Sequence, residues 1–154
     1  MTETTPSDTI KKLEKRMRYI SGIIKQNGRK ILNNYPITSP QFVALQWLLE
    51  EGDLTIGELS NKISLAFSTT TDLVDRMEKN DLVERIRSTT DRRVVRIHVL
   101  EKGKTIIHEV IEKRQEYLEE VMEEFSVEQR ETLHELLNFL HEQMKIVNEN
   151  QQQR

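Results

Sequence analysis

LTIGELSNKISLAFSTTTDLVDRMEKNDLVERIRSTTDRRVVRIHVLEKG, residues 54–103, is the stretch that decides the fold. It opens with a T-x-x-E capping box formed by Thr55 and Glu58, in which the side chain of each residue caps the backbone N–H of the other. Leu54 and Leu59 flank this box at the spacing of a hydrophobic staple. The pattern predicts a short helix that begins after Thr55 and ends near residue 63.

A second helix is predicted after a tight turn. One of its sides repeats at intervals of three and four residues, the spacing of a buried stripe, through Thr70, Leu73, Val74 and Met77. The opposite side and its flanks are polar and carry Ser68, Thr69, Thr71, Asp72, Asp75, Arg76 and Lys79. This helix therefore has one side for the core and one for solvent or a ligand.

The periodicity then changes from that of a helix to that of a strand. Residues 82–87 are rich in Val and Ile, and Val95, Ile97 and Val99 alternate with polar residues. Two paired strands are predicted around a Ser-Thr-Thr-Asp turn at residues 88–91. Two helices followed by such a ribbon predict a winged helix-turn-helix. Its second helix would enter the major groove of DNA, and its ribbon tip would reach phosphates or the adjacent minor groove.

The ribbon concentrates arginine in a chain whose net charge is −3. A single acid, Asp91, stands among Arg85, Arg87, Arg92, Arg93 and Arg96. Arginine binds phosphate or guanine through two parallel hydrogen bonds. A plainer interpretation is a small α+β element whose helix packs and whose arginines are solvated. The ordered combination of helices, ribbon and arginines favours DNA binding.

Four short motifs add specificity: LVDR at residues 73–76, LVER at 82–85, DRR at 91–93 and EKG at 101–103. Together with ITSPQF at residues 37–42, they resemble the MarR (multiple-antibiotic-resistance regulator) family of bacterial winged helix-turn-helix transcription factors. With helices predicted on both sides, the resemblance covers nearly the whole chain.

The resemblance implies a mostly α fold with a small two- or three-stranded β-wing. A single domain, residues 1–154, would comprise a DNA-binding lobe at residues 37–100 and dimerisation helices at residues 8–34 and 101–147. The expected DNA-binding residues of the second helix, which would meet base edges and phosphates, are Ser68, Thr69, Thr71, Asp72 and Arg76. Those of the wing are Arg87, Asp91, Arg92, Arg93 and Arg96. Arg92 and Arg93 would reach the minor groove or its phosphates, Asp91 would orient an arginine, and Arg87 and Arg96 would contact the DNA backbone.

Three positions depart from the family pattern. Asp81 stands where the family usually has glycine, and Asn and Asp are the other residues that tolerate a left-handed backbone. Leu100 replaces the usual threonine cap of the next helix. Asp72 stands where many relatives have a basic residue, and its carboxylate could accept a hydrogen bond from a cytosine amino group.

The segments that flank the lobe carry more apolar surface than one small lobe covers. The first repeats in steps of three and four, through Ile10, Leu13, Met17, Ile20, Ile24 and Ile31. The last helix follows an S-x-x-Q capping box at residues 126–129 and carries Leu133, Leu136, Leu137, Leu140, Met144 and Val147 on one stripe. Pairing two chains would bury these stripes and set two recognition helices about one DNA turn, ~34 Å, apart. A monomeric bundle is the alternative.

A small aromatic or phenolic effector, bound between the lobe and the dimerisation helices, is also implied by the resemblance. The candidate lining residues are Tyr35, Phe42 and Trp47. The sequence alone does not reveal the pocket, and a lone tryptophan is more often part of a core. Ser39, followed by Pro40, is expected to cap the helix that holds two of these residues.

Other function classes lack support. The chain has no cysteine, so disulfides and thiolate metal sites are excluded. No phosphate loop, nucleophile elbow or metalloprotease motif is present, so no enzyme activity and no cofactor are expected. No metal site is predicted either, although the sequence leaves open whether His108, His134 or His141 binds one. The absence of an apolar run near 18 residues and of an apolar signal core predicts a cytoplasmic protein without membrane contact.

The sequence therefore predicts a homodimeric, sequence-specific transcriptional regulator that binds double-stranded DNA at a pseudo-palindromic operator. Repression, relieved by a small-molecule ligand, is the expected mode. The alternative is a helical protein-interaction module whose winged helix does not bind DNA. Such a module has no need of the arginine cluster.

Overall fold

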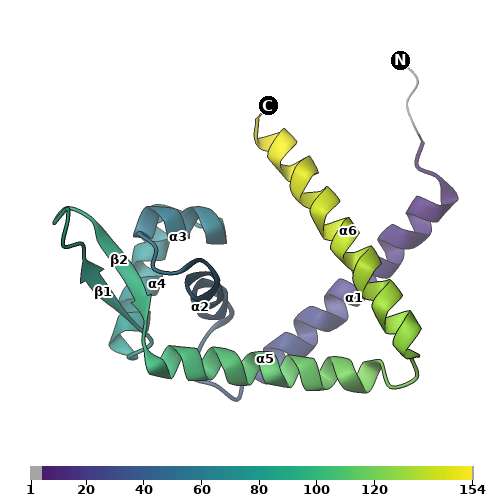
Figure 1. Ribbon diagram of the computed structural model, residues 1–154, viewed down its shortest axis with the longest axis horizontal. Coiled ribbons are helices and arrows are strands. Elements are labelled where there is room, and N and C mark those ends of the chain that lie inside the picture. The colour runs from purple at the N-terminus through teal and green to yellow at the C-terminus, as the bar shows by residue number, and fades with distance from the viewer. Residues whose placement is uncertain (1–4, 154) are drawn as a thin grey trace. The chain divides into compact units, whose positions relative to one another are not determined.

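The computed structural model describes residues 5–153 and divides into two compact units, with the boundary after Arg114. The elements, in chain order, are α1 (Asp8–Leu32), α2 (Ser39–Glu51), α3 (Ile56–Ile63), α4 (Phe67–Lys79), β1 (Val83–Arg87), β2 (Val95–Val99), α5 (Glu101–Val121) and α6 (Val127–Gln152) (Figure 1). The mostly α architecture with a two-stranded wing is the predicted winged helix-turn-helix. The single-domain organisation over residues 1–154 stays a prediction.

Capping boxes start three of the helices. Thr55 caps α3 together with Glu58, and Ser126 caps α6 together with Gln129, both as predicted. The expected cap of α2 at Ser39 is wrong by one residue. Thr38 is the cap because its hydroxyl accepts from the Gln41 N–H at 3.3 Å, while the Gln41 side chain accepts from the Thr38 N–H at 3.0 Å.

The end of α4 confirms the prediction for Asp81, which takes a left-handed backbone with φ of 61°. The Leu82 N–H donates to the Met77 carbonyl at 3.0 Å, and the Asp81 N–H donates to the Glu78 carbonyl at 3.1 Å. These two bonds form a Schellman motif, which satisfies carbonyls that the helix end leaves unpaired. The chain can therefore turn sharply from α4 into the wing without a glycine.

The wing is an antiparallel hairpin in which Val83 pairs with Val99 and Arg87 pairs with Val95. The Ser88 N–H donates to the Val94 carbonyl at 2.8 Å and closes the tip. One further bridge joins Leu54 to the central residue of β2, so the wing has two strands and a single-residue third partner. The hairpin projects away from the helices of the lobe (Figure 1).

The core of the first unit lies between α2, α3, α4, the base of the wing and the first turns of α5. Its most buried side chains are those of Leu45, Leu59, Val74, Met77, Leu82, Val83, Ile97, Ile107 and Val110. Gly103 on α5 lies close against this core. A Cβ at this position would stand 2.6 Å from the Leu82 carbonyl oxygen and 2.9 Å from a Val99 methyl, so a side chain would clash. The glycine of the EKG motif thus permits α5 to approach the wing.

Replacing Gly103 with alanine is expected to destabilise the protein by about 1–3 kcal/mol, because the backbone carbonyl of Leu82 has little room to move. Thermal unfolding followed by circular dichroism measures this loss. Gly57→Ala is the matched control, since a Cβ there meets only the Thr55 hydroxyl at 3.9 Å. Equal melting temperatures for the two variants would contradict the close packing of α5.

Two long helices bury none of their described residues within the single chain, α1 in the first unit and α6 in the second. Only the end of α1 packs on the core, through Ile31 and Leu32. The remaining predicted stripe of α1 and most of that on α6 are exposed; Ile20 is 53% and Leu137 is 52% exposed. Helix α6 continues past the predicted end at Val147. No helix in residues 5–153 is long and apolar enough to cross a membrane.

Candidate nucleic-acid interface

Helix α4 presents its predicted polar side to solvent. Ser68, Thr69, Asp72 and Arg76 are exposed, and Thr71 is half-buried at the edge of the packed side. The buried side consists of Thr70, Val74 and Met77, with Leu73 half-buried beside them. The predicted periodicity of this helix is therefore confirmed. Whether its exposed residues contact DNA stays a prediction.

The first turn of α4 is tied together by threonine hydroxyls. Thr70 Oγ1 donates to the Ala66 carbonyl and Thr71 Oγ1 donates to the Phe67 carbonyl, each at 3.0 Å. No side chain caps the helix at Ala66. A helix start without a side-chain cap leaves backbone N–H groups for water or for an anion such as a phosphate.

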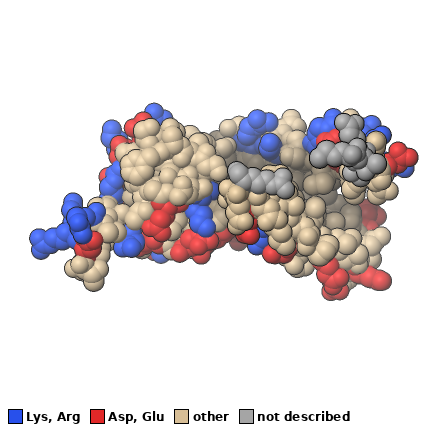
Figure 2. Space-filling view, turned by 90° about the horizontal axis from the view of Figure 1, so that it is seen from above, with Lys and Arg blue, Asp and Glu red and all other residues tan. Residues whose placement is uncertain are grey.

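The wing tip gathers positive charge. Lys and Arg side chains crowd the end of the hairpin at the left of Figure 2. Arg92 and Arg93 are both exposed there, and the Arg93 side chain retains 91% of its accessible surface. Arg96 on β2 is exposed as well. These three arginines were predicted to lie on one ribbon, and all three are accessible to solvent in the structure.

Asp91 and Arg87 organise this tip. The Asp91 carboxylate accepts from the Arg93 N–H at 3.1 Å and from Arg93 Nε at 3.2 Å. These two hydrogen bonds, the backbone bond first, lower the pKa of Asp91 below its ordinary value. Arg87 Nη1 donates to the Arg92 carbonyl at 2.7 Å. Asp91 therefore holds Arg93, and part of Arg87 is used inside the hairpin.

Arg85 does not belong with the accessible arginines of the wing. Its guanidinium donates to Asp75 at 2.6 Å and to Glu78 at 2.8 Å, and its own N–H donates to Glu78 at 3.1 Å. Both acids lie on α4, so Arg85 fastens β1 to α4. This contact could not be predicted from local sequence, because the partners are seven and ten residues away.

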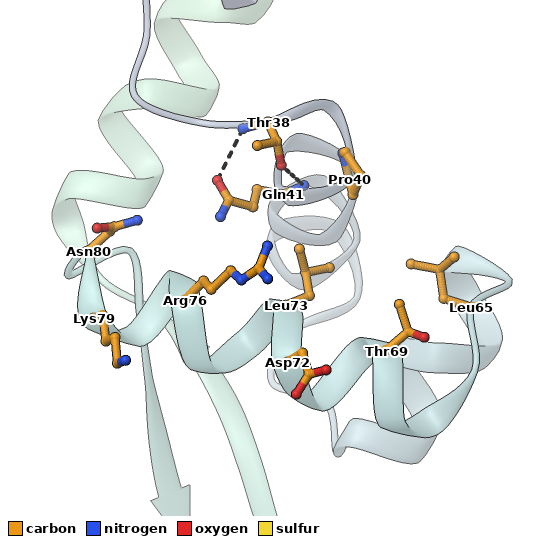
Figure 3. A pocket seen from close by; sticks show the side chains of 10 residues that line it. All are labelled: Thr38, Pro40, Gln41, Leu65, Thr69, Asp72, Leu73, Arg76, Lys79 and Asn80. Atoms are coloured by element: carbon orange, nitrogen blue, oxygen red, sulfur yellow. Dashed lines mark hydrogen bonds between the residues drawn. The ribbon is translucent and has the colours of Figure 1, made fainter.

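A groove of about 720 Å³ runs between the start of α2 and the exposed side of α4. Its lining includes Thr69, Asp72 and Arg76 from the predicted set, and Figure 3 shows the Arg76 guanidinium reaching toward Gln41. Sequence reasoning missed its other residues: Thr38, Pro40, Gln41, Leu65, Leu73, Lys79 and Asn80. The T-x-x-Q capping box at residues 38–41 was the available signal for the α2 side. The groove places polar side chains of two helices along one track.

The three candidate effector residues do not line one hollow together. Phe42 lines a hollow of about 450 Å³ between α1, α2 and α5, where the Arg114 guanidinium lies 5.7 Å from its ring. Lys25 and Arg29 of α1 line the same hollow. Neither Tyr35 nor Trp47 is among its lining residues. An apolar floor under three cations suits an aromatic anion.

Tyr35 and Trp47 have other neighbours. Burial, and then the carboxylate of Glu109, raise the pKa of the Tyr35 phenol. Trp47 packs against the core, with Lys62 Nζ 5.1 Å from its ring. Their assignment as effector residues stays a prediction.

None of the histidines lines the groove beside α4 or the hollow beside Phe42. His98 Nδ1 is 2.9 Å from an Asp53 carboxylate oxygen, which joins β2 to the loop before α3. His108, His134 and His141 are exposed on α5 and α6. In the part of the chain that the structure describes, no three His, Asp or Glu residues are grouped to hold a metal ion.

Known proteins resemble most of the chain. The MarR family model matches residues 37–95. The uncharacterized HTH-type transcriptional regulator YsmB of Bacillus subtilis is 57% identical over 140 residues, which cover 91% of this chain and 96% of YsmB. A solved MarR family protein from Bacillus stearothermophilus is 60% identical with a TM-score of 0.86, over 92% of this chain and 99% of that one. NadR, solved in complex with 4-hydroxyphenylacetate, is 26% identical with a TM-score of 0.64, over 91% of this chain and 96% of that one.

Proposed function

Because this chain belongs to the MarR family of DNA-binding transcriptional regulators, we propose that it is a homodimeric repressor released from its operator by a small aromatic ligand. The observation that carries the DNA-binding surface is the wing tip. Arg92 and Arg93 are exposed beside a single acid that already has partners, on the same lobe as the exposed side of α4. A protein-interaction module would gain nothing from such a tip.

In this proposal, α4 lies in the major groove and the wing follows the adjacent minor groove. Ser68, Thr69 and Thr71 meet base edges, Asp72 accepts from a cytosine amino group, and Arg76 binds a phosphate that runs along the groove between α2 and α4. Arg96, and the part of Arg87 that the hairpin leaves free, contact the DNA backbone. The polar start of α2 supports this path for the phosphates.

The homodimer is proposed from the helices that flank the lobe, α1, α5 and α6. The apolar stripes of α1 and α6 are exposed over several turns, which is costly in water and is relieved when two chains pair. Such a dimer presents two copies of α4 and therefore selects an operator with inverted half-sites. Binding at a promoter would exclude RNA polymerase, which is the simplest route to repression, and the protein would act in the bacterial cytoplasm.

The proposed ligand site is the hollow beside Phe42. Lys25, Arg29 and Arg114 supply positive charge around apolar side chains, so the ligand class is an aromatic carboxylate. NadR, which binds the phenolic acid 4-hydroxyphenylacetate, supports this choice. A ligand wedged between α1 and α2 releases DNA only if it prefers a lobe position that differs from the DNA-bound one.

Selection from random DNA tests the proposal, followed by fluorescence anisotropy on the recovered sequence. We expect inverted half-sites whose centres lie about 10 base pairs, or a multiple of that, apart. Aromatic carboxylates should then release the DNA, at several-fold higher concentration for Arg114→Gln than for the wild type or for an Arg16→Gln control on α1. Recovery of no sequence, with affinity only in the nonspecific range of ~10⁻⁴ to 10⁻⁶ M, would favour the protein-interaction module.

A further inference from the structure

Phe67 is the first residue of α4, and its aromatic side chain is exposed to solvent. It is 62% exposed, whereas the other exposed large apolar residues of the lobe, Val43, Leu65 and Ile86, are only 38–40% exposed. The core does not use this ring. The buried stripe predicted for α4 begins three residues later, at Thr70, so Phe67 is not part of it.

The hydrogen bond of Thr71 determines which groups beside Phe67 remain available to a ligand. Thr71 lies one turn further along α4 on the same side, and its hydroxyl proton is used by the Phe67 carbonyl at 3.0 Å. Thr71 is therefore left with a methyl group and an acceptor oxygen. The start of α4 thus combines an aromatic ring and a threonine methyl with the exposed polar residues Ser68 and Thr69.

Double-stranded DNA offers one apolar group on the base edges of its major groove, the 5-methyl group of thymine. The first residues of a recognition helix are those that contact base edges, and phenylalanine is among the side chains that contact this methyl. A protein partner would need a wider apolar patch, whereas the residues that follow Phe67 at the uncapped helix start, Ser68 and Thr69, are polar and exposed. The positive wing tip on the same lobe also favours DNA as the occupant.

We propose that Phe67, supported by the Thr71 methyl, reads the 5-methyl group of one thymine in each half-site of the operator. The inference rests on the proposed function, since it requires α4 to lie in the major groove. Phe67 would then be a specificity-determining residue. The operator should contain an invariant thymine at the position that the start of α4 contacts.

Deoxyuridine scanning of the selected operator tests this role, because deoxyuridine lacks only the methyl group. For the wild type, a single substitution at the contacted thymine of one half-site should weaken binding about four-fold, the loss expected for one buried methyl. Phe67→Ala should bind the unmodified operator more weakly and show no difference between thymine and deoxyuridine at that position. Phe67→Leu should keep part of the difference. Thermal unfolding of both variants should match the wild type, since the ring is not in the core.

Phe139→Ala is the matched control, because Phe139 is 64% exposed on α6 and lies off the apolar stripe of that helix. It should retain the wild-type response to deoxyuridine. If the wild type and Phe67→Ala respond alike at every position, the inference is overturned while sequence-specific binding, and with it the proposed function, stands. If the wild type binds no DNA specifically, both are overturned.

Discussion

Changing Arg92 and Arg93 together to alanine is expected to weaken operator binding by about 1–3 kcal/mol for each arginine that reads the groove. The slope of log affinity against log salt should flatten by about 0.9 for each phosphate contact that is lost. Both side chains are exposed at the hairpin tip and make no contact with the core, so the fold should be unaffected. Anisotropy at several salt concentrations measures both quantities.

The control for this double variant is Lys11→Ala/Lys12→Ala, which removes the same charge from the exposed start of α1. If the wing acts through specific contacts, the lysine variant should bind nearly as the wild type does. Equal losses for the two double variants would instead indicate a general electrostatic effect. In that case the wing would not be assigned to the minor groove.

Changing Leu140 to Asp is expected to convert the proposed homodimer to a monomer. Leu140 lies on the α6 stripe, and a carboxylate there would be buried without a partner when two chains pair. Sedimentation equilibrium should report the single-chain mass of 18.2 kDa in place of twice that value. Affinity for the full operator should fall by about 10²- to 10⁴-fold, because the two lobes that bind the two half-sites are no longer held in one molecule.

Phe139→Asp provides the comparison, since it puts the same charge one residue away and off the stripe. This variant should stay dimeric. A Leu140→Asp protein that also stays dimeric would mean that the chains pair through another surface. A wild-type monomer at micromolar concentration would contradict the homodimer itself.

Features with short-range causes were predictable from the sequence. The capping boxes at Thr55 and Ser126 depend on residues three positions apart, and the alternation of β2 depends on neighbours. The error at Ser39 arose because Ser39-Pro40 and Thr38 with Gln41 both carry cap signals, and the reciprocal bonds of Thr38 and Gln41 form in the structure. Local sequence did not distinguish the two.

Features with long-range causes could not be predicted. The groove beside α4 requires the relative placement of α2 and α4, and the hollow beside Phe42 requires α1, α2 and α5. The identity of an aromatic residue in or beside a predicted helix, such as Trp47 or Tyr35, does not tell which way its side chain points. Asp72 was predictable as an exposed acid from its position opposite the buried stripe. The hydrogen bond from a cytosine amino group to Asp72 stays a prediction.

The contact between Arg85 and α4 has a consequence for how operators can vary. Through Asp75 and Glu78, it holds the base of the wing at a constant position on the recognition helix, by both side-chain and backbone bonds. In the proposed DNA complex, the number of base pairs within one half-site between the segment under α4 and the segment under the wing is then constant. Inserting a base pair inside a half-site should abolish recognition, whereas the spacing between half-sites is the variable that a ligand, or a diverged promoter, can change.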